Sequence, residues 1–153
     1  MHNTDSDYAA VLANIKTIMT NTSLSESFYE MVLKRLDSFN YIFDVAYDGW
    51  LIAFCMQKVE SHIMNDCNTS NIPDGLIPTA VDLVCGEFFF NKNQSGQLEI
   101  TGLDLTGSVT SIKEGDTSVS FDTSQTDDQK LDALITYLRK GEGDLVCYRK
   151  LHW

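Results

Sequence analysis

Apolar residues recur at helical spacing in five stretches of this 153-residue chain, and polar or glycine-containing segments separate those stretches. The clearest apolar stripe begins after Thr126, with Asp127 and Asp128 in the first turn, and ends before Gly141. Its members are Leu131, Leu134, Ile135 and Leu138. The pattern predicts a mainly α fold, a small helical bundle of about five helices.

The four upstream stripes predict the remaining helices. We expect the first helix over residues 7–20 and the second over residues 24–40. The third should end near residue 67, and the fourth should have Pro78 in its first turn. Ser23 and Glu26 fit a capping box for the second of these helices. Gly86 weakens the interior of the fourth, so it predicts a close contact between helices. The polar segment 91–102 is expected to be a loop.

A stretch from Gly107 to Asp122 precedes the last helix. Val109 and Ile112 lie before a Glu-Gly-Asp turn, and Val119 and Phe121 follow it. We expect a short β-hairpin or an extended loop here. The alternative from the residues alone is a helix that stops at Gly115.

Part of this stretch, Ile112–Phe121 (Ile-Lys-Glu-Gly-Asp-Thr-Ser-Val-Ser-Phe), resembles a signature of the head–tail connector (adaptor) proteins of tailed bacteriophages and related prophages of Gram-positive bacteria. Further similar pieces occur in the same order, so that the resemblance covers roughly residues 24–153. They are residues 68–76, 84–89, 130–135 and 148–153.

The resemblance implies a structural virion protein rather than an enzyme. Such a connector assembles as a ring, in this family a dodecamer, beneath the portal protein. The ring extends the DNA channel and joins the capsid to a neck, head-completion or tail protein, while DNA passes without sequence-specific binding. The implied location is the head–tail junction of the virion, after assembly in the host cytoplasm, with no membrane and no cofactor.

The resemblance also suggests how the chain is divided. Residues 1–22 lie outside it and are expected to be an N-terminal extension with an accessory helix, either a packing element or a contact arm. Residues 23–144 would form the connector domain. Residues 145–153 would form an extended C-terminal docking tail.

Candidate contact residues follow from the resemblance together with residue type, since aromatic residues and arginine dominate protein interfaces. The tail is the candidate for portal contact, by analogy with connectors whose C-termini reach into the portal; the alternative is that it folds back on its own domain. Its portal-binding candidates are Tyr148, Arg149, Lys150, Leu151, His152 and Trp153. For subunit or neck contacts the candidates are Lys113, Glu114, Gly115, Asp116, Phe88, Phe89 and Phe90. Core packing is the alternative for the three phenylalanines.

The formal net charge of −11 argues against an outer surface that grips nucleic acid. Two alternatives of other classes remain: an acidic DNA mimic that inhibits a nuclease, and a small regulatory protein-binding module. A DNA mimic needs acids concentrated on one face, whereas the acids here are spread along the chain.

No motif for catalysis or metal binding is present. The chain has no phosphate-binding glycine loop, nucleophile elbow or His-Glu-x-x-His pattern, and its four cysteines form no Cys-x-x-Cys pair. An enzyme would require a pocket that joins His62 to Cys55 or Asp66. The N-terminus is polar and acidic, so we predict no secretory signal there.

Overall fold

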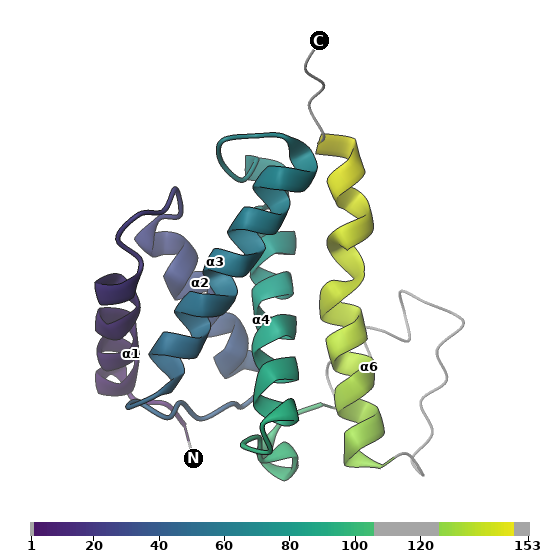
Figure 1. Cartoon of the computed structure of the whole chain (residues 1–153). Coiled ribbons are helices and arrows are strands. Elements are labelled where there is room, and N and C mark those ends of the chain that lie inside the picture. Colours follow the sequence, from purple (N-terminus) through teal and green to yellow (C-terminus); the bar gives the residue numbers. More distant parts are fainter. Residues whose placement is uncertain (1, 106–125, 149–153) are drawn as a thin grey trace.

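The computed structural model describes residues 2–105 and 126–148, and these residues form helices joined by loops, with no strand among them (Figure 1). The α-helices are α1 (Asp5–Ile18), α2 (Glu26–Ser38), α3 (Asp48–Cys67), α4 (Ile77–Gln94) and α6 (Asp127–Arg139). Short 3-10 helices are η1 (Asp74–Leu76), η2 (Ile100–Gly102) and η3 (Lys140–Tyr148). The prediction of a mainly helical bundle is confirmed.

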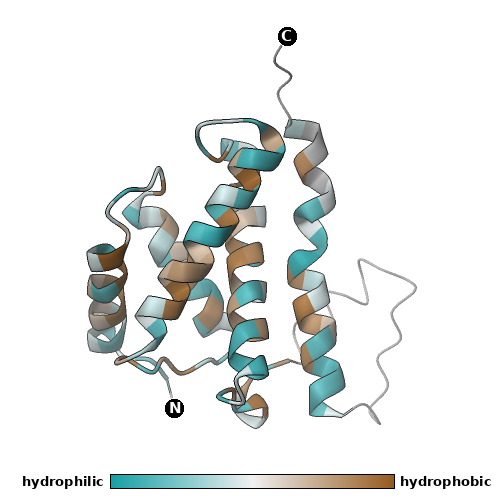
Figure 2. Cartoon of the chain, viewed as in Figure 1, coloured by the Kyte–Doolittle hydropathy of each residue, from teal (hydrophilic) through white to brown (hydrophobic). Residues whose placement is uncertain are grey.

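Helix α4 lies at the centre of the bundle and contacts α2, α3, α6 and η3. Hydrophobic residues recur along α3, α4 and α6 where the three helices lie side by side (Figure 2). The most deeply buried residues of α4 are Ala80, Val84, Cys85, Phe88 and Phe89. Because α4 is surrounded, its apolar residues cannot be confined to one stripe.

The loop expected over residues 91–102 is shorter than predicted, because α4 continues to Gln94 and η2 covers Ile100–Gly102. Polar residues extend α4 because they have partners within the bundle. Asn91 Nδ2 donates to the Glu87 carbonyl at 2.8 Å, and Lys92 is buried against a carboxylate of α3. Polarity alone therefore gave a wrong boundary.

Gly86 lies where α4 packs closely on α6, as predicted from the sequence. A Cβ atom at Gly86 would lie 3.2 Å from Leu138 Cβ and 3.3 Å from Arg139 Cγ. The missing side chain allows the two helices to pack with their backbones close together.

Helix α1 belongs to the same core rather than standing apart from it. Val11 and Ile15 are fully buried, and α1 packs along α3. Gly49 of α3 lies so close to α1 that a Cβ would be 2.7 Å from Asn14 Cβ. Of the two alternatives for the N-terminal helix, the packing element is confirmed for α1.

The predicted capping box of Ser23 and Glu26 is wrong. The N-cap of α2 is Ser25, whose side chain accepts a hydrogen bond from Phe28 N. Ser23 Oγ instead donates to Glu60 Oε2 of α3 at 2.6 Å, because that buried carboxylate requires donors. A tertiary contact thus replaces the local one.

The C-terminal region is helical further than expected. The α-helix α6 ends at Arg139 with Lys140 as its C-cap, just before Gly141 as predicted, but the chain then continues as the 3-10 helix η3 to Tyr148. Leu145 is buried, and its carbonyl lies 3.4 Å from Cys67 Sγ. Residues 145–148, predicted as the start of a docking tail, therefore fold back on their own domain. None of the described helices is long and apolar enough to cross a membrane.

Candidate functional site

The segment that contains the signature and the predicted docking tail join the described bundle at opposite ends. Helix α6 begins at the end of the bundle where α4 finishes, and η3 ends near the start of α4 (Figure 1). At the η3 end, the Tyr148 ring covers Gly75 and leaves no room there for a Cβ. At the other end, Asp104 N donates to Phe39 O at 2.8 Å, which fixes the described chain just before the signature.

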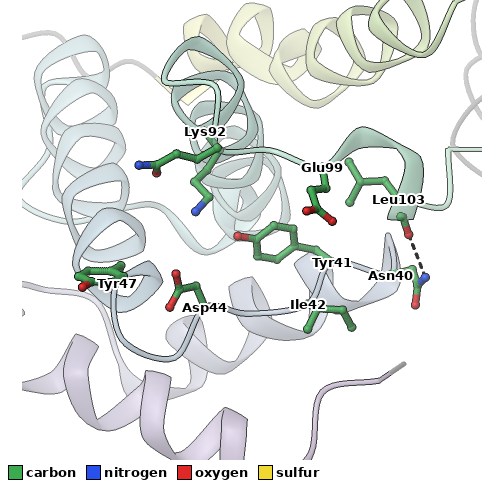
Figure 3. A pocket seen from close by; sticks show the side chains of 10 residues that line it. Asn40, Tyr41, Ile42, Asp44, Tyr47, Lys92, Glu99 and Leu103 are labelled. Atoms are coloured by element: carbon green, nitrogen blue, oxygen red, sulfur yellow. Dashed lines mark hydrogen bonds between the residues drawn. The ribbon is translucent and has the colours of Figure 1, made fainter.

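A groove of about 940 Å³ lies at this second end, between the α2–α3 connection and the segment that follows α4 (Figure 3). Asn40 Nδ2 donates to Gly102 O at 3.0 Å and ties the two walls together. The lining includes apolar side chains and two acids. These are Ile42, Tyr47 and Leu103, with Asp44 and Glu99.

A buried ion pair supports the wall of the groove. Lys92 Nζ lies 2.9 Å from Asp48 Oδ1, and both side chains are almost completely buried. Tyr41 Oη donates to Asp48 Oδ2 at 2.6 Å, and Asp44 N donates to the same oxygen at 2.8 Å. Burial and the neighbouring Asp48 carboxylate raise the pKa of Tyr41 above its usual value. The Lys92 charge is thus neutralised inside the protein, and Asp44 and Glu99 leave the groove acidic.

An exposed aromatic pair lies on the outer face of α3. The rings of Trp50 and Phe54 stack with centroids 5.8 Å apart and planes 10° apart. Trp50 is 61% exposed and Phe54 46% exposed, and Tyr47, one turn earlier, is 73% exposed. These three residues were not among the predicted contacts. Their four-residue spacing, away from the stripe of Ile52, Cys55, Val59 and Ile63, was a signal that could have found them.

Of the three consecutive phenylalanines of α4, two are buried in the core and one is exposed. Phe88 and Phe89 are fully buried, and their rings pack edge-on against Tyr41 with centroid distances of 5.2 and 5.9 Å. The expectation that they form subunit contacts is therefore corrected, because a partner cannot reach side chains that already fill the core. Phe90 is 39% exposed, and Arg139 Cζ lies 4.6 Å from its ring centroid.

A row of charges crosses the outer surface of three helices beside these aromatic residues. Glu87 of α4 pairs on one side with Lys58 of α3, at 3.3 Å between Nζ and Oε2. On the other side it pairs with Arg139 of α6, at 3.2 Å between Nη2 and Oε1. The row links α3, α4 and α6, and Glu142 of η3 lines the same small pocket as its three members, so the cations and acids there are balanced.

The pocket that His62 lines does not include the residues that an enzyme hypothesis would require. It measures about 140 Å³ and lacks both Cys55 and Asp66. Cys55 is fully buried, and burial raises the pKa of its thiol to about 12. Within residues 2–105 and 126–148, no cluster of three or more His, Cys, Asp or Glu side chains could hold a metal ion.

The remaining predicted contacts fall outside the described residues. They are Lys113, Glu114, Gly115 and Asp116 in the signature, and Arg149, Lys150, Leu151, His152 and Trp153 in the tail. Of the predicted portal contacts only Tyr148 is described, and it is 38% exposed.

The arrangement of helices, groove and aromatic pair defines a helical protein with candidate interaction surfaces. No protein-family model matches the chain, and comparison with curated proteins and with solved structures gives no significant match.

Proposed function

We propose that this chain is a head–tail connector of a tailed bacteriophage or prophage. In this proposal it assembles as a ring, a dodecamer if it follows the family, beneath the portal. The ring extends the DNA channel and joins the capsid to a neck or tail protein. The proposal starts from the ordered resemblance over roughly residues 24–153.

The packing of α4 against α6 supports the proposal. Residues 84–89 and 130–135 both belong to the resemblance and are about 40 residues apart in the sequence. They lie on two helices that contact each other, and the Gly86 approach to Leu138 sets the spacing between those helices. Two pieces of the ordered resemblance thus pack against each other in the fold.

The observation that carries the proposal is the separation of two attachment points along the bundle. The tail continues from Tyr148 at one end, and the signature lies between Leu105 and Thr126, with Thr126 at the start of α6 at the other end (Figure 1). A connector must hold one neighbour above and another below, and a rigid helical body keeps two such contacts at a fixed distance. In our proposal the tail binds the portal and the signature meets the next neck component or an adjacent subunit.

The charge of the chain is compatible with a channel through which DNA moves. A net charge of −11 per subunit repels the phosphate backbone, and repulsion without base contacts lets DNA slide instead of binding. The proposal therefore includes no sequence-specific recognition of DNA.

Removal of residues 149–153 tests the portal contact. Because Leu145 is buried and Tyr148 packs on Gly75, the cut follows Tyr148, and we expect the melting temperature to be unchanged. Affinity for the portal ring of the same genome should fall at least about tenfold, as expected when basic and aromatic contacts are lost. Lys34→Glu, on the exposed side of α2, is the control and should bind normally. Unchanged binding of the truncated chain would refute the docking tail.

A further inference from the structure

Hydrogen bonds hold the walls of the groove between the α2–α3 connection and the segment after α4 (Figure 3). Gln97 N donates to Lys92 O at 3.0 Å, and Asp104 N donates to Phe39 O at 2.8 Å, so the second wall is tied at both ends. A groove whose walls are already in place binds a partner without the entropic cost of ordering its own backbone.

Apolar side chains line the groove and remain accessible to a partner. Ile42 is 40% exposed, whereas Tyr41 and Phe43 on either side of it are buried in the core. Tyr47 is strongly exposed, and Leu103 of the other wall is half-buried. The volume of about 940 Å³ is at the upper end of the range of ~300–1,000 Å³ that ligand pockets have. The groove therefore suits a segment of polypeptide with large apolar side chains.

The charge of the groove favours a basic partner. Its charged lining residues are Asp44, Lys92 and Glu99, and the buried Asp48 neutralises Lys92. Asp44 and Glu99 are exposed, and within the described residues neither of them forms an ion pair. Residues 40–47 and 97–103 contain no lysine, arginine or histidine. Two uncompensated carboxylates thus remain in the groove, and they complement lysine or arginine side chains.

The segments of this chain outside the described residues are less suited to the groove of their own subunit. Residues 106–125 contain one lysine and three acids, and a net charge of −2 is repelled by an acidic groove. Residues 149–153 are basic, but they follow Tyr148 at the opposite end of α4, which has 18 residues and is about 27 Å long. Five residues span at most about 18 Å. These comparisons favour an occupant from another molecule.

We propose that the groove binds an extended segment of a partner protein that presents lysine or arginine beside large apolar side chains. The groove lies at the end of the bundle that leads to the signature. In the connector the partner is the next neck component, and this choice of partner rests on the proposed function. The chemistry of the segment follows from the groove itself. The inference names the described surface that would meet the neck.

Binding of a defined peptide tests the charge of the groove. The probe is a fluorescein-labelled heptapeptide of alternating lysine and leucine, and fluorescence anisotropy measures its affinity for the full-length chain. The double variant Asp44→Asn and Glu99→Gln should bind it at least about fivefold more weakly than the wild type does. The Asp44→Asn change keeps an acceptor for Ala46 N, so the connection should stay folded.

The matched control for this variant is Glu30→Gln with Asp132→Asn. It removes the same two negative charges from exposed positions of α2 and α6, away from the groove, and should bind the peptide as the wild type does. Equal losses in the two double variants would mean that the peptide follows the overall charge of the chain. That result, or a wild-type chain that does not bind the peptide, would overturn the inference.

Ile42→Ser tests the apolar part of the recognition. Ile42 is partly exposed, so the melting temperature should change little, while affinity for the lysine–leucine peptide should fall at least about threefold. Affinity for a heptapeptide of alternating lysine and serine should stay the same. Met31→Ser is the control, because Met31 is a 38% exposed hydrophobic residue on α2. Unchanged affinity of Ile42→Ser for the lysine–leucine peptide would contradict the inference.

The neck protein of the same genome separates this inference from the proposed function. On the portal ring, the Asp44→Asn and Glu99→Gln variant should assemble as the wild type does but bind the neck protein at least about fivefold more weakly. Full binding of the neck protein by the variant would overturn the inference and leave the connector function standing. Peptide binding by a chain that leaves the portal bare would support the groove and contradict the connector function.

The tail of a second copy is the other occupant that this test distinguishes. If it fills the groove, the wild-type chain should self-associate without portal, and both the Asp44→Asn and Glu99→Gln variant and the chain without residues 149–153 should stay monomeric in sedimentation. That result would overturn the inference, because the groove would then bind this chain and not a neck component.

Discussion

Two carboxylates inside the bundle show how single residues fix the connections between helices. Asp48 accepts hydrogen bonds from Lys92, Tyr41 and the backbone of Asp44, and so holds the α2–α3 connection against α4. Glu60 accepts from Thr22 and Ser23 and holds the α1–α2 connection against α3. Each carboxylate is buried, and its desolvation is offset by several donors.

Replacement of Lys92 by Met removes one half of the buried ion pair and leaves Asp48 without its cation. We expect the free energy of unfolding to fall by about 3–5 kcal/mol, as is typical when a buried pair is broken on one side. Urea unfolding followed by circular dichroism measures the change. Lys58→Met is the control, because its partner Glu87 keeps a second cation and Lys58 is exposed, so it should cost less than about 1 kcal/mol. An equal loss of unfolding free energy in the two variants would show that the buried ion pair stabilises the fold no more than the exposed one.

At the scale of helices, the sequence predicted what depends on local periodicity and missed what depends on tertiary contacts. Helix α6 begins after Thr126 as predicted, and the Thr126 side chain caps it by accepting a hydrogen bond from Gln129 N. The close approach at Gly86 also followed from the sequence, because a helix interior tolerates glycine mainly where another helix is near. The N-cap of α2 and the end of α4 could not be predicted from the sequence, because contacts with buried carboxylates on α3 determine both positions.

Which residues are exposed and which line the groove was harder to predict than the helices, because both depend on tertiary contacts. Phe88, Phe89 and Phe90 are identical in type and consecutive, and only their position on the central helix separates two core residues from one surface residue. The groove joins residues 40–47 to residues 97–103, which no sequence spacing connects. By contrast, the exposed pair Trp50 and Phe54 follows helical spacing on α3 and could have been predicted.

Helix α6 offers a direct test of the predicted stripe. Leu134 is buried between α6 and the core, so Leu134→Ala should lower the free energy of unfolding by about 2–5 kcal/mol. Thr136→Ala, on the exposed side of the same helix, should change it by less than about 0.5 kcal/mol. The two variants are compared by chemical unfolding. A cost below about 0.5 kcal/mol for Leu134→Ala would mean that α6 is not packed as described.

At the scale of the whole molecule, the two ends of the helical bundle lead to different predicted contacts. The η3 end leads to the tail that we propose binds the portal, and the opposite end leads to the signature (Figure 1). The flank carries the exposed, stacked pair of Trp50 and Phe54 on α3. An axial pair of contacts and a lateral one are what a ring inserted between two other assemblies requires.

Electron microscopy and native mass spectrometry of the chain mixed with the portal ring of the same genome test this account most directly. We expect a portal capped by a stacked ring of this chain, with the η3 end toward the portal. A bare portal beside unassembled chains, at every salt and protein concentration tried, would contradict it and would favour the regulatory module or the acidic DNA mimic.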